Sequence, residues 1–345
     1  MSDTTAITMR DIAQALGVSV PTVSRALKGT GRISPDLREK ICSYAREHNY
    51  YPNALAGSLR LSRIEPQRVI GVIVPQITHY YFSTILSGIE DEASSHGYRI
   101  MVAQSDESYE REMSICQSFL QNRVCGVIVS QAKDTIRYEH FQHLMDAGVP
   151  LVFYDRICTG LNTSRVVVDD YHGAFVAVSH LIDTGCRRIA FYGSPMRLEI
   201  SKNRYNGYRD ALAQHGLRAD DSLKFECDNR ADAEELTPDV LARADRPDGF
   251  FAVNDDTAIG ILYTAKHLGF RVPDDISICG FTNGERAVAC EPMLTTVEQR
   301  GGRVGREAVD VLLDHVEKRI PPGKVEKRVV KTRLVVRGTT MKIED

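Results

Sequence analysis

The sequence has no long hydrophobic run, no closely paired cysteines and no large excess of charge of one sign. Its longest apolar stretches are short segments such as Val69–Val74, far below the ~18 residues that a membrane span needs, so we expect no membrane partner. The N-terminus lacks a basic segment followed by an apolar one, so we expect no signal peptide. The eight cysteines are scattered singly without a C-x-x-C motif, which predicts reduced thiols in a cytosolic protein.

The net charge of −3 argues against a nucleic-acid binder only while it is averaged over the whole chain. Residues 1–63 contain nine Lys and Arg against five Asp and Glu, a charge of +4, and the remaining residues carry −7. Opposite charges in two parts of one chain indicate a small nucleic-acid-binding module joined to a larger acidic domain. The length of 345 residues is enough for about two domains whose cores need no disulfides.

Three short helices are predicted in the first 51 residues. Thr8 is a good N-cap for the first helix, and Gly17 is a good residue to end it. Ser19 caps a second helix almost at once, and Ser34 caps a third with Pro35 at its first position. Two short helices joined by a Gly-Val-Ser turn and followed by a third are the helix-turn-helix arrangement.

The second helix presents the residue types that enter a major groove. They are hydroxyls for phosphates (Ser19, Thr22, Ser24), apolar side chains for a thymine methyl (Val20, Pro21) and long cations (Arg25, Lys28). We expect Arg25 to read a guanine through two parallel hydrogen bonds. Two alternatives stay open: Arg25 only neutralises a phosphate, or the whole segment is a three-helix module that binds protein.

A short fourth helix is expected at residues 52–62, with Asn53 as its cap, followed by a linker at 63–68. A helix of two turns is marginal in water, and Gly57 weakens it by a further ~1 kcal/mol relative to alanine. It is therefore expected to fold only against DNA or a second copy of the chain. An ordinary linker is the alternative.

These segments closely resemble the headpiece of the lactose/galactose repressor family of bacterial transcription regulators. The resemblance covers about sixty residues, MRDIAQALGVSVPTVSRALKG and ISPDLREKICSYAREHNYYPNALAGSLR. It implies that Leu59 wedges into the minor groove at the operator centre, that Asn53 caps a hinge helix and that Arg32 faces the DNA backbone. The expected DNA contacts are Thr8, Ser19, Val20, Pro21, Thr22, Ser24, Arg25, Lys28, Arg32, Asn53 and Leu59.

The rest of the chain alternates strand-like and helix-like segments, which predicts two lobes with doubly wound parallel sheets. The first lobe is expected at 69–165, completed by about 298–320, and the second at 166–297, completed by about 325–338. The predicted strands are Val69–Val74, Tyr98–Gln104, Gly126–Val129 and Leu151–Tyr154, then Val166–Val168, Arg188–Tyr192, Gly249–Val253 and Ile276–Gly280. Ligands bind outside the carboxyl ends of such strands.

This part resembles periplasmic sugar-binding proteins, and the resemblance implies a small effector between the lobes. The expected contacts are Tyr81, Phe82, Asp155, Arg156, Arg204, Asn254, Asp255, Thr282 and Gln299. Tyr81 and Phe82 match aromatic positions that stack on a ligand, and Arg204 lies in an N-R-x-x-G-[FYW] motif. Thr282 replaces the aspartate of the family's G-[FY]-D, which leaves open a phosphorylated or acidic sugar, another metabolite or a protein co-regulator.

Other chemistries are not supported by the sequence. Gly301-Gly302-x-x-Gly305 is not a complete dinucleotide motif, and His140-x-x-His143 has no evident third metal ligand. We therefore expect no catalytic residue, no metal and no cofactor. The predicted protein is a cytoplasmic, nucleoid-associated repressor that binds a pseudo-palindromic operator as a homodimer and responds to an effector. A regulator controlled by a protein partner and a solute receptor that does not bind DNA are the alternatives.

Overall fold

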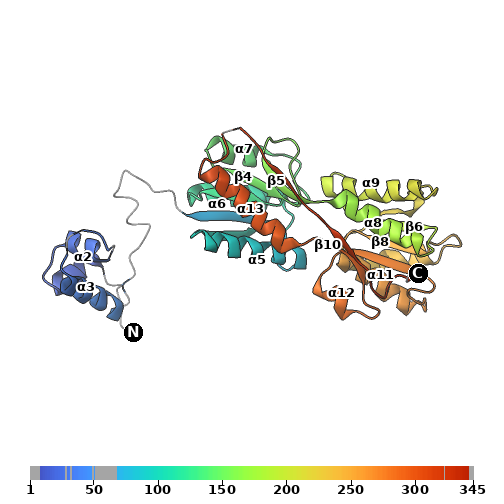
Figure 1. Cartoon of the computed structure of the whole chain (residues 1–345), viewed down its shortest axis with the longest axis horizontal. Coiled ribbons are helices and arrows are strands. Elements are labelled where there is room, and N and C mark those ends of the chain that lie inside the picture. The colour runs from blue at the N-terminus through green and yellow to red at the C-terminus, as the bar shows by residue number, and fades with distance from the viewer. Residues whose placement is uncertain are drawn as a thin grey trace. The chain divides into compact units, whose positions relative to one another are not determined.

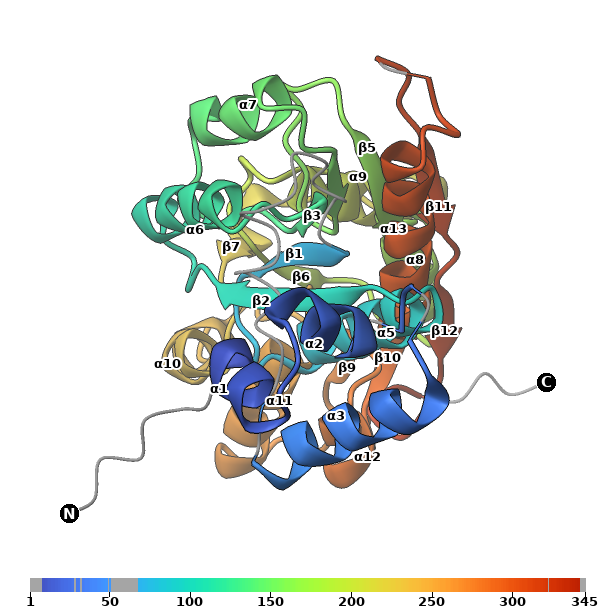
Figure 2. The same cartoon turned by 90° about the vertical axis from the view of Figure 1, so that its left-hand side faces the viewer.

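A computed structural model describes residues 8–27, 29–31, 33–48, 50, 68–321 and 323–341. The chain divides into two compact units, Met1–Glu65 and Pro66–Asp345 (Figures 1 and 2). Several predicted features lie outside the described residues: the hinge helix 52–62 with Asn53 and Leu59, the linker 63–68 except Arg68, and the two basic residues Lys28 and Arg32.

Helices make up the described part of the first unit. They are α1 (Met9–Ala15), α2 (Val20–Leu27) and α3 (Pro35–Glu47). Thr8 and Asp11 form a reciprocal cap in which the Asp11 amide donates to Thr8 Oγ1 at 3.4 Å and the Thr8 amide donates to Asp11 Oδ2 at 2.8 Å. Gly17 ends α1 in the left-handed conformation, with φ at +65°. Ser19 Oγ accepts the Thr22 amide of α2 at 3.3 Å, so the predicted helix-turn-helix is confirmed.

One small core holds these helices together. Ile12, Val23 and Ile41, one from each helix, are fully buried, and Ala13 and Ala26 fill the space between them. Helices of 7, 8 and 13 residues are marginal alone, so this apolar contact is the main source of their stability.

The second unit contains two six-stranded sheets among the described residues. The first sheet is parallel throughout in the order β11-β5-β4-β3-β1-β2. Its strands are β1 (Val69–Val74), β2 (Arg99–Gln104), β3 (Gly126–Val129), β4 (Leu151–Tyr154), β5 (Ser164–Val168) and β11 (Lys327–Val330). Helices α5 (Tyr80–Ser95) and α13 (Gly301–Val316) cover one face, and α6 (Tyr109–Gln121) and α7 (Glu139–Asp146) cover the other.

The second sheet has the order β12-β10-β9-β8-β6-β7, with β12 antiparallel to β10. Its strands are β6 (Ile189–Gly193), β7 (Lys224–Glu226), β8 (Gly249–Ala252), β9 (Ser277–Thr282), β10 (Thr295–Glu298) and β12 (Arg333–Val335). Its helices are α8 (Asp170–Asp183), α9 (Glu199–Gln214), α10 (Arg230–Leu241), α11 (Asp255–His267) and α12 (Glu285–Ala289), with a short 3₁₀ turn at Asp221–Leu223. Helices α8 and α9 pack on one face, and α10 and α11 pack on the other. No helix among the described residues is long and apolar enough to cross a membrane.

The predicted lobe boundaries are wrong in two places. Strand β5, expected to open the second lobe at 166, pairs with β4 in the first sheet, with Val152 opposite Ser164. The tail predicted at 325–338 is divided, because β11 pairs with β5 in the first sheet and β12 pairs with β10 in the second. An apolar run shows that a segment is a buried strand, but it carries no information about which sheet the strand joins.

Candidate DNA-binding surface and effector site

The outward face of α2 is the candidate DNA-binding surface. Ser19, Pro21 and Arg25 are exposed, whereas Thr22 and Ser24 are half-buried. The hydroxyl groups of Ser19 and Thr22 are hydrogen bonded to each other at 2.8 Å, so they form one small polar patch at the start of the helix. Polar groups at a helix N-terminus suit contact with DNA phosphates. The predicted apolar contact Val20 is half-buried and packs partly on the headpiece core.

Arg25 lies over the backbone of Gly31. A Cβ atom built at Gly31 would lie 3.2 Å from Arg25 Cδ, and Gly31 has a φ of +82°. The aliphatic part of Arg25 therefore rests on a position that has no side chain, while the residue as a whole stays exposed. The sequence prediction did not include this support for Arg25. The signal that could have indicated it is Gly31, a glycine that follows closely after the helix.

Asp155 is the centre of the candidate effector site. It follows β4 with a φ of +54°, is 4% exposed, and its Oδ1 has no hydrogen-bond partner in the described part of the chain. Burial raises the pKa of this carboxyl group, and the nearby Arg156, Arg204 and His79 act in the opposite direction. Arg204 belongs to the second lobe, so the site draws on both lobes.

Arg204 is held by a buried ion pair. Its Nε donates to Asp170 Oδ1 at 2.7 Å, and another guanidinium nitrogen donates to the Val253 carbonyl at 2.6 Å. The guanidinium lies 4.0 Å from the centre of the Phe281 ring. Burial raises the pKa of Asp170 to about 6, and Arg204 opposes this rise. The Arg204 side chain is thus held by a carboxylate, a backbone carbonyl and an aromatic face.

The predicted aromatic residues Tyr81 and Phe82 lie on α5, and both are 4% exposed. The Arg156 guanidinium lies 5.5 Å from the centre of the Phe82 ring, and the Tyr154 ring meets Phe82 edge-on at 6.3 Å. The Tyr81 hydroxyl is buried and lacks a hydrogen-bond partner among the described residues. Burial raises the pKa of Tyr81, as does the nearby Asp155, so the hydroxyl stays protonated.

The predicted residues of the second lobe are partly occupied by structural bonds. Asn254 caps α11, since its Oδ1 accepts the Thr257 amide at 2.8 Å, and its amide group donates to the Asp228 carbonyl at 2.6 Å. Asp255 accepts from the Gly284 amide at 2.7 Å and from Thr296 Oγ1 at 2.5 Å. Both side chains have their hydrogen-bonding capacity largely filled by the lobe itself.

Thr282 and Gln299 are hydrogen bonded to each other, and Gln299 keeps one polar atom without a partner among the described residues. Thr282 Oγ1 donates to Gln299 Oε1 at 3.2 Å, which leaves Gln299 Nε2 buried without a partner in the described structure. Thr282 also lines a cavity of about 240 Å³ between the lobes, together with His79 and Tyr80 from the first lobe and Asp255 from the second. A small ligand has room in this cavity, although Gln299 itself does not line it.

Sequence reasoning missed several polar groups at the carboxyl ends of the strands. Ser105 follows β2, Ser130 and Gln131 follow β3, and each has a buried side-chain oxygen with no partner among the described residues. Buried polar atoms are almost always hydrogen bonded, so a group of unpartnered ones marks a place where ligand or water atoms fit. Their position directly after predicted strands was the available signal.

Comparisons with known proteins agree with this arrangement. The model of the bacterial regulatory proteins, lacI family, matches residues 8–53, and that of the periplasmic binding protein-like domain matches residues 178–340. The chain is 30% identical to the HTH-type transcriptional repressor PurR of Vibrio campbellii, over 97% of this chain and 99% of that protein. It is 32% identical to the ribose operon repressor of Bacillus subtilis, over 90% and 92%. The chain belongs to the LacI family.

Solved structures of LacI-family proteins share the fold. The regulator CelR in complex with cellobiose has a TM-score of 0.73 at 26% identity and covers 96% of this chain and 99% of its own. A lac repressor dimer bound to operator and the anti-inducer ONPF has a TM-score of 0.84 at 24% identity, over 98% and 100%, which is a likeness of fold. The predicted family and fold class are confirmed.

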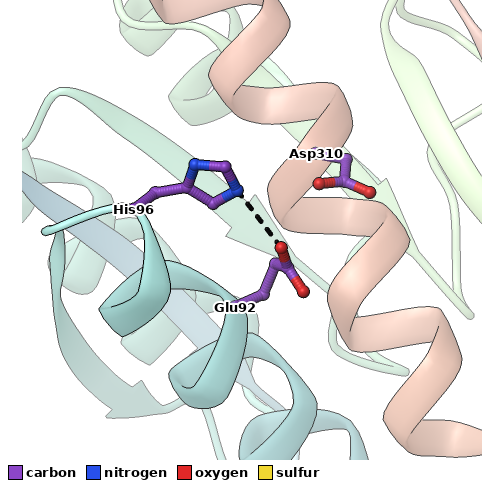
Figure 3. Close-up of side chains that lie close together, drawn as sticks. All are labelled: Glu92, His96 and Asp310. Atoms are coloured by element: carbon purple, nitrogen blue, oxygen red, sulfur yellow. Dashed lines mark hydrogen bonds and ion pairs between the residues drawn. The ribbon is translucent and has the colours of Figure 1, made fainter.

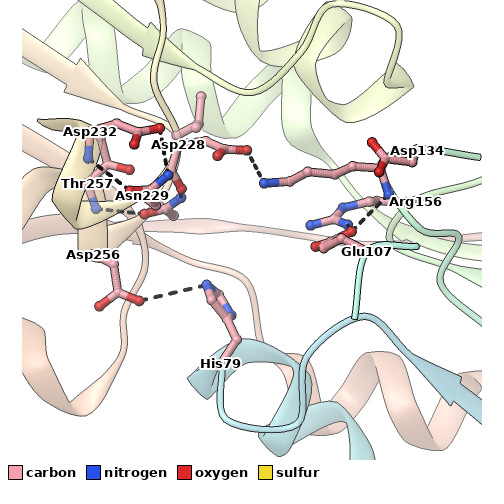
Figure 4. A network of polar contacts seen from close by, with 12 residues as sticks. His79, Glu107, Asp134, Arg156, Asp228, Asn229, Asp232, Asp256 and Thr257 are labelled. Atoms are coloured by element: carbon pink, nitrogen blue, oxygen red, sulfur yellow. Dashed lines mark hydrogen bonds and ion pairs between the residues drawn. The ribbon is translucent and has the colours of Figure 1, made fainter. Parts of the chain in front are cut away.

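Polar contacts join the two lobes of this LacI-family chain around the site (Figure 4). Lys133 Nζ lies 2.6 Å from Asp228 Oδ2, and His79 Nε2 lies 4.0 Å from Asp256 Oδ2. Burial alone would raise the pKa of Asp228, but Lys133 and other donors hold this pKa below its usual value. Burial lowers the pKa of His79, which keeps this imidazole neutral near pH 7.

A buried carboxylate fixes the loop that carries Lys133. Glu112 accepts hydrogen bonds from the Ala132 amide at 2.7 Å, Thr135 Oγ1 at 2.5 Å and His140 Nε2 at 3.0 Å. The Lys133 amide itself donates to the side chain of Glu107 at 2.8 Å. His140, weighed above as half of a metal pair, thus serves to hold this loop.

Proposed function

We propose that the chain is a transcription repressor that binds a pseudo-palindromic operator as a homodimer. Binding of an effector either lowers or raises its affinity for the operator. The observation that carries this proposal is the exposed Arg25 on α2 of a confirmed helix-turn-helix. Relatives named as the PurR repressor and the ribose operon repressor support it over nearly their whole length. We place the protein in the cytoplasm, associated with the nucleoid, and we assign it no catalytic activity.

On DNA, α2 lies in the major groove and the polar patch of Ser19 and Thr22 contacts the sugar–phosphate backbone. Arg25 donates two hydrogen bonds to O6 and N7 of a guanine, which is the commonest specific contact of an arginine with DNA. Its support on Gly31 reduces the number of conformations that it loses on binding. A dimer reads two half-sites, because one helix of 8 residues contacts too few bases to be specific.

The effector is an uncharged, hydroxyl-rich metabolite. The two arginines near Asp155 are already committed, Arg156 to Glu107 at 2.6 Å and Arg204 to Asp170, and Lys133 is committed to Asp228. Asp155 keeps an unpartnered carboxylate oxygen, which repels an anion but accepts a hydroxyl. The free atoms of Tyr81 and Gln299 add both a donor and an acceptor. The replacement of the family's aspartate by Thr282 left several effector classes open. Of these, a phosphorylated or acidic sugar is therefore disfavoured.

The effector acts by changing how the two lobes are arranged relative to each other. Groups from both lobes converge on Asp155, so a bound ligand changes the free energy of one lobe arrangement relative to another. Operator affinity changes by the same factor by which the operator changes effector affinity.

Substitution of Arg25 tests the DNA-binding role. An operator is first selected from random duplex DNA by the full-length protein. We expect Arg25→Ala to bind this operator and a scrambled duplex with equal affinity in fluorescence anisotropy, whereas the wild type discriminates between them. The matched control is Lys40→Ala, which removes an exposed cation from α3 and should keep the discrimination. Discrimination retained by Arg25→Ala would refute the base-reading role.

A thermal-shift screen of neutral sugars, sugar phosphates and sugar acids tests the effector class. Stabilisation is expected from neutral compounds, and it should be lost in Asp155→Asn. A hit among the phosphates or acids that still stabilises Asp155→Asn contradicts the assigned chemistry. Operator release or retention by the hit then shows whether it induces or co-represses.

A further inference from the structure

Helices α5 and α13 approach each other closely on one face of the first sheet. A Cβ atom at Gly88 would lie 2.2 Å from the Gly302 carbonyl oxygen, and one at Gly305 would lie 2.2 Å from the Ile85 carbonyl oxygen. The two backbones are therefore almost in contact along this seam. At the following turns of the two helices, side chains from one helix reach the other.

Glu92, His96 and Asp310 meet at this point of the seam (Figure 3). Glu92 and His96 are four residues apart on α5 and its C-terminal end, so they project from the same side, and Asp310 comes from α13. One donor atom from each of the three side chains lies within 4.8 Å of the others. Glu92 Oε1 and His96 Nε2 are 3.2 Å apart.

The local positive charge is shared among too many carboxylates to neutralise this group. Arg328 lies 3.8 Å from Asp310 Oδ2, but it is closer to carboxylate oxygens of other residues: Glu307 at 3.0 Å, Glu326 at 3.3 Å and Asp314 at 3.6 Å. Two carboxylates thus face each other across the seam with a deficit of positive charge.

We propose that Glu92, His96 and Asp310 bind a divalent transition-metal ion of the Zn²⁺ type. One imidazole nitrogen and two carboxylate oxygens are ligands that Zn²⁺ accepts, with water in the remaining position. Mg²⁺ and Ca²⁺ prefer sets of oxygen ligands and suit this group less well. The His96 side chain is 45% exposed, which leaves a path for the ion and room for the water.

Metal binding at this site ties α5 to α13. Helix α13 follows β10 of the second sheet but packs on the first, so the ion fixes a returning segment of the chain to the first lobe. Because the two helices are separated by more than 200 residues, the complete site exists only in the folded protein. A ligand that binds only the folded state raises the unfolding temperature, and the stabilisation grows with the logarithm of the free ligand concentration once that exceeds the Kd.

The test uses the full-length protein stripped with chelator and titrated with ZnSO₄, MnCl₂ or MgCl₂ in a calorimeter. We expect Zn²⁺ to bind more tightly than Mn²⁺ and Mg²⁺, and Zn²⁺ to raise the unfolding temperature. His96→Ala and Asp310→Asn should each weaken the Zn²⁺ affinity by about tenfold or more and remove the thermal shift. Matched controls are His143→Ala and Glu90→Gln, an exposed histidine and an exposed carboxylate outside the site, and both should bind as the wild type does.

Co²⁺ spectra separate this site from the cysteines. Ligation by nitrogen and oxygen gives weak visible bands without the intense near-ultraviolet absorption of a cobalt–thiolate bond, and these bands should disappear in His96→Ala. The proposal is overturned if Zn²⁺ binds the double variant His96→Ala/Asp310→Asn as it binds the wild type, if the Co²⁺ complex absorbs as a thiolate, or if no Zn²⁺ binding is detected. Equal unfolding temperatures of the metal-free proteins verify that the variants fold.

Discussion

A buried carboxyl group binds its proton more tightly than an exposed one unless the protein supplies donors or positive charge. Asp255 illustrates the balance, since burial raises its pKa to about 6 although Thr296 and the Gly284 amide both donate to it. In the unfolded chain its pKa returns to the ordinary value near 3.8. The folded state thus holds this proton more strongly, and the stability that it contributes is complete below the unfolded pKa and is lost as the pH rises through about 6.

Asp255→Asn should therefore flatten the dependence of stability on pH. Between pH 5 and 6 the wild type is expected to lose up to about 1.4 kcal/mol of unfolding free energy per pH unit through this group, and the variant should lack that contribution. Urea unfolding at pH 5, 6 and 7 measures the difference. Asp275→Asn is the control, because Arg271 holds the pKa of this half-buried carboxyl at about 2, outside the range measured. Parallel curves for wild type and Asp255→Asn would contradict the raised pKa.

The close seam between α5 and α13 is a property of elements, and glycine makes it possible. Gly305 faces the Ile85 carbonyl oxygen, and a methyl group there would overlap it at 2.2 Å. At Gly302, on the same helix, the nearest atoms to an added Cβ are 3.7 Å away, which is ordinary contact. The two positions therefore differ in the room that they leave for a methyl group, although both lie in the first two turns of α13.

Gly305→Ala should destabilise the protein by about 3 kcal/mol, because the helices must move apart to admit the methyl group. Gly302→Ala should be neutral or slightly stabilising, since alanine favours the helix and meets no close atom. Thermal unfolding of both variants decides the matter. Equal destabilisation by the two substitutions would mean that the seam is looser than described.

Elements set by local chemistry could be predicted from the sequence, and those set by distant contacts could not. The caps at Thr8 and Ser19 place α1 and α2 within one turn of their observed starts, because capping depends on adjacent residues. Strand β5 lies between β4 and β11 in the first sheet, and β11 is more than 150 residues away in the sequence. Asn254 shows the same limit at the site: its cap of α11 is local chemistry, but its hydrogen bond to the Asp228 carbonyl, 26 residues away, required the fold.

At the scale of the whole second unit, the lobes are joined both by the chain and by ion pairs. The chain passes from β5 to α8, from β10 to α13 and from β11 to β12, so each lobe contains segments that follow the other in sequence. Lys133 and Asp228 add a direct contact between the lobes, with side chains 25% and 11% exposed. An ion pair shielded to this degree is stronger than a surface pair.

The contact between Lys133 and Asp228 should appear as an energetic coupling between the lobes. Lys133→Met leaves Asp228 half-shielded without its cation, so we expect a loss of about 2 kcal/mol, and the double variant with Asp228→Asn should recover part of it. Urea unfolding of the four proteins is expected to give a coupling of about 1–2 kcal/mol. The same cycle on the exposed pair Lys202 and Glu199, within α9, should give less than about 0.5 kcal/mol. A coupling between Lys133 and Asp228 as small as that of the exposed pair would mean that the arrangement of the lobes does not depend on this contact.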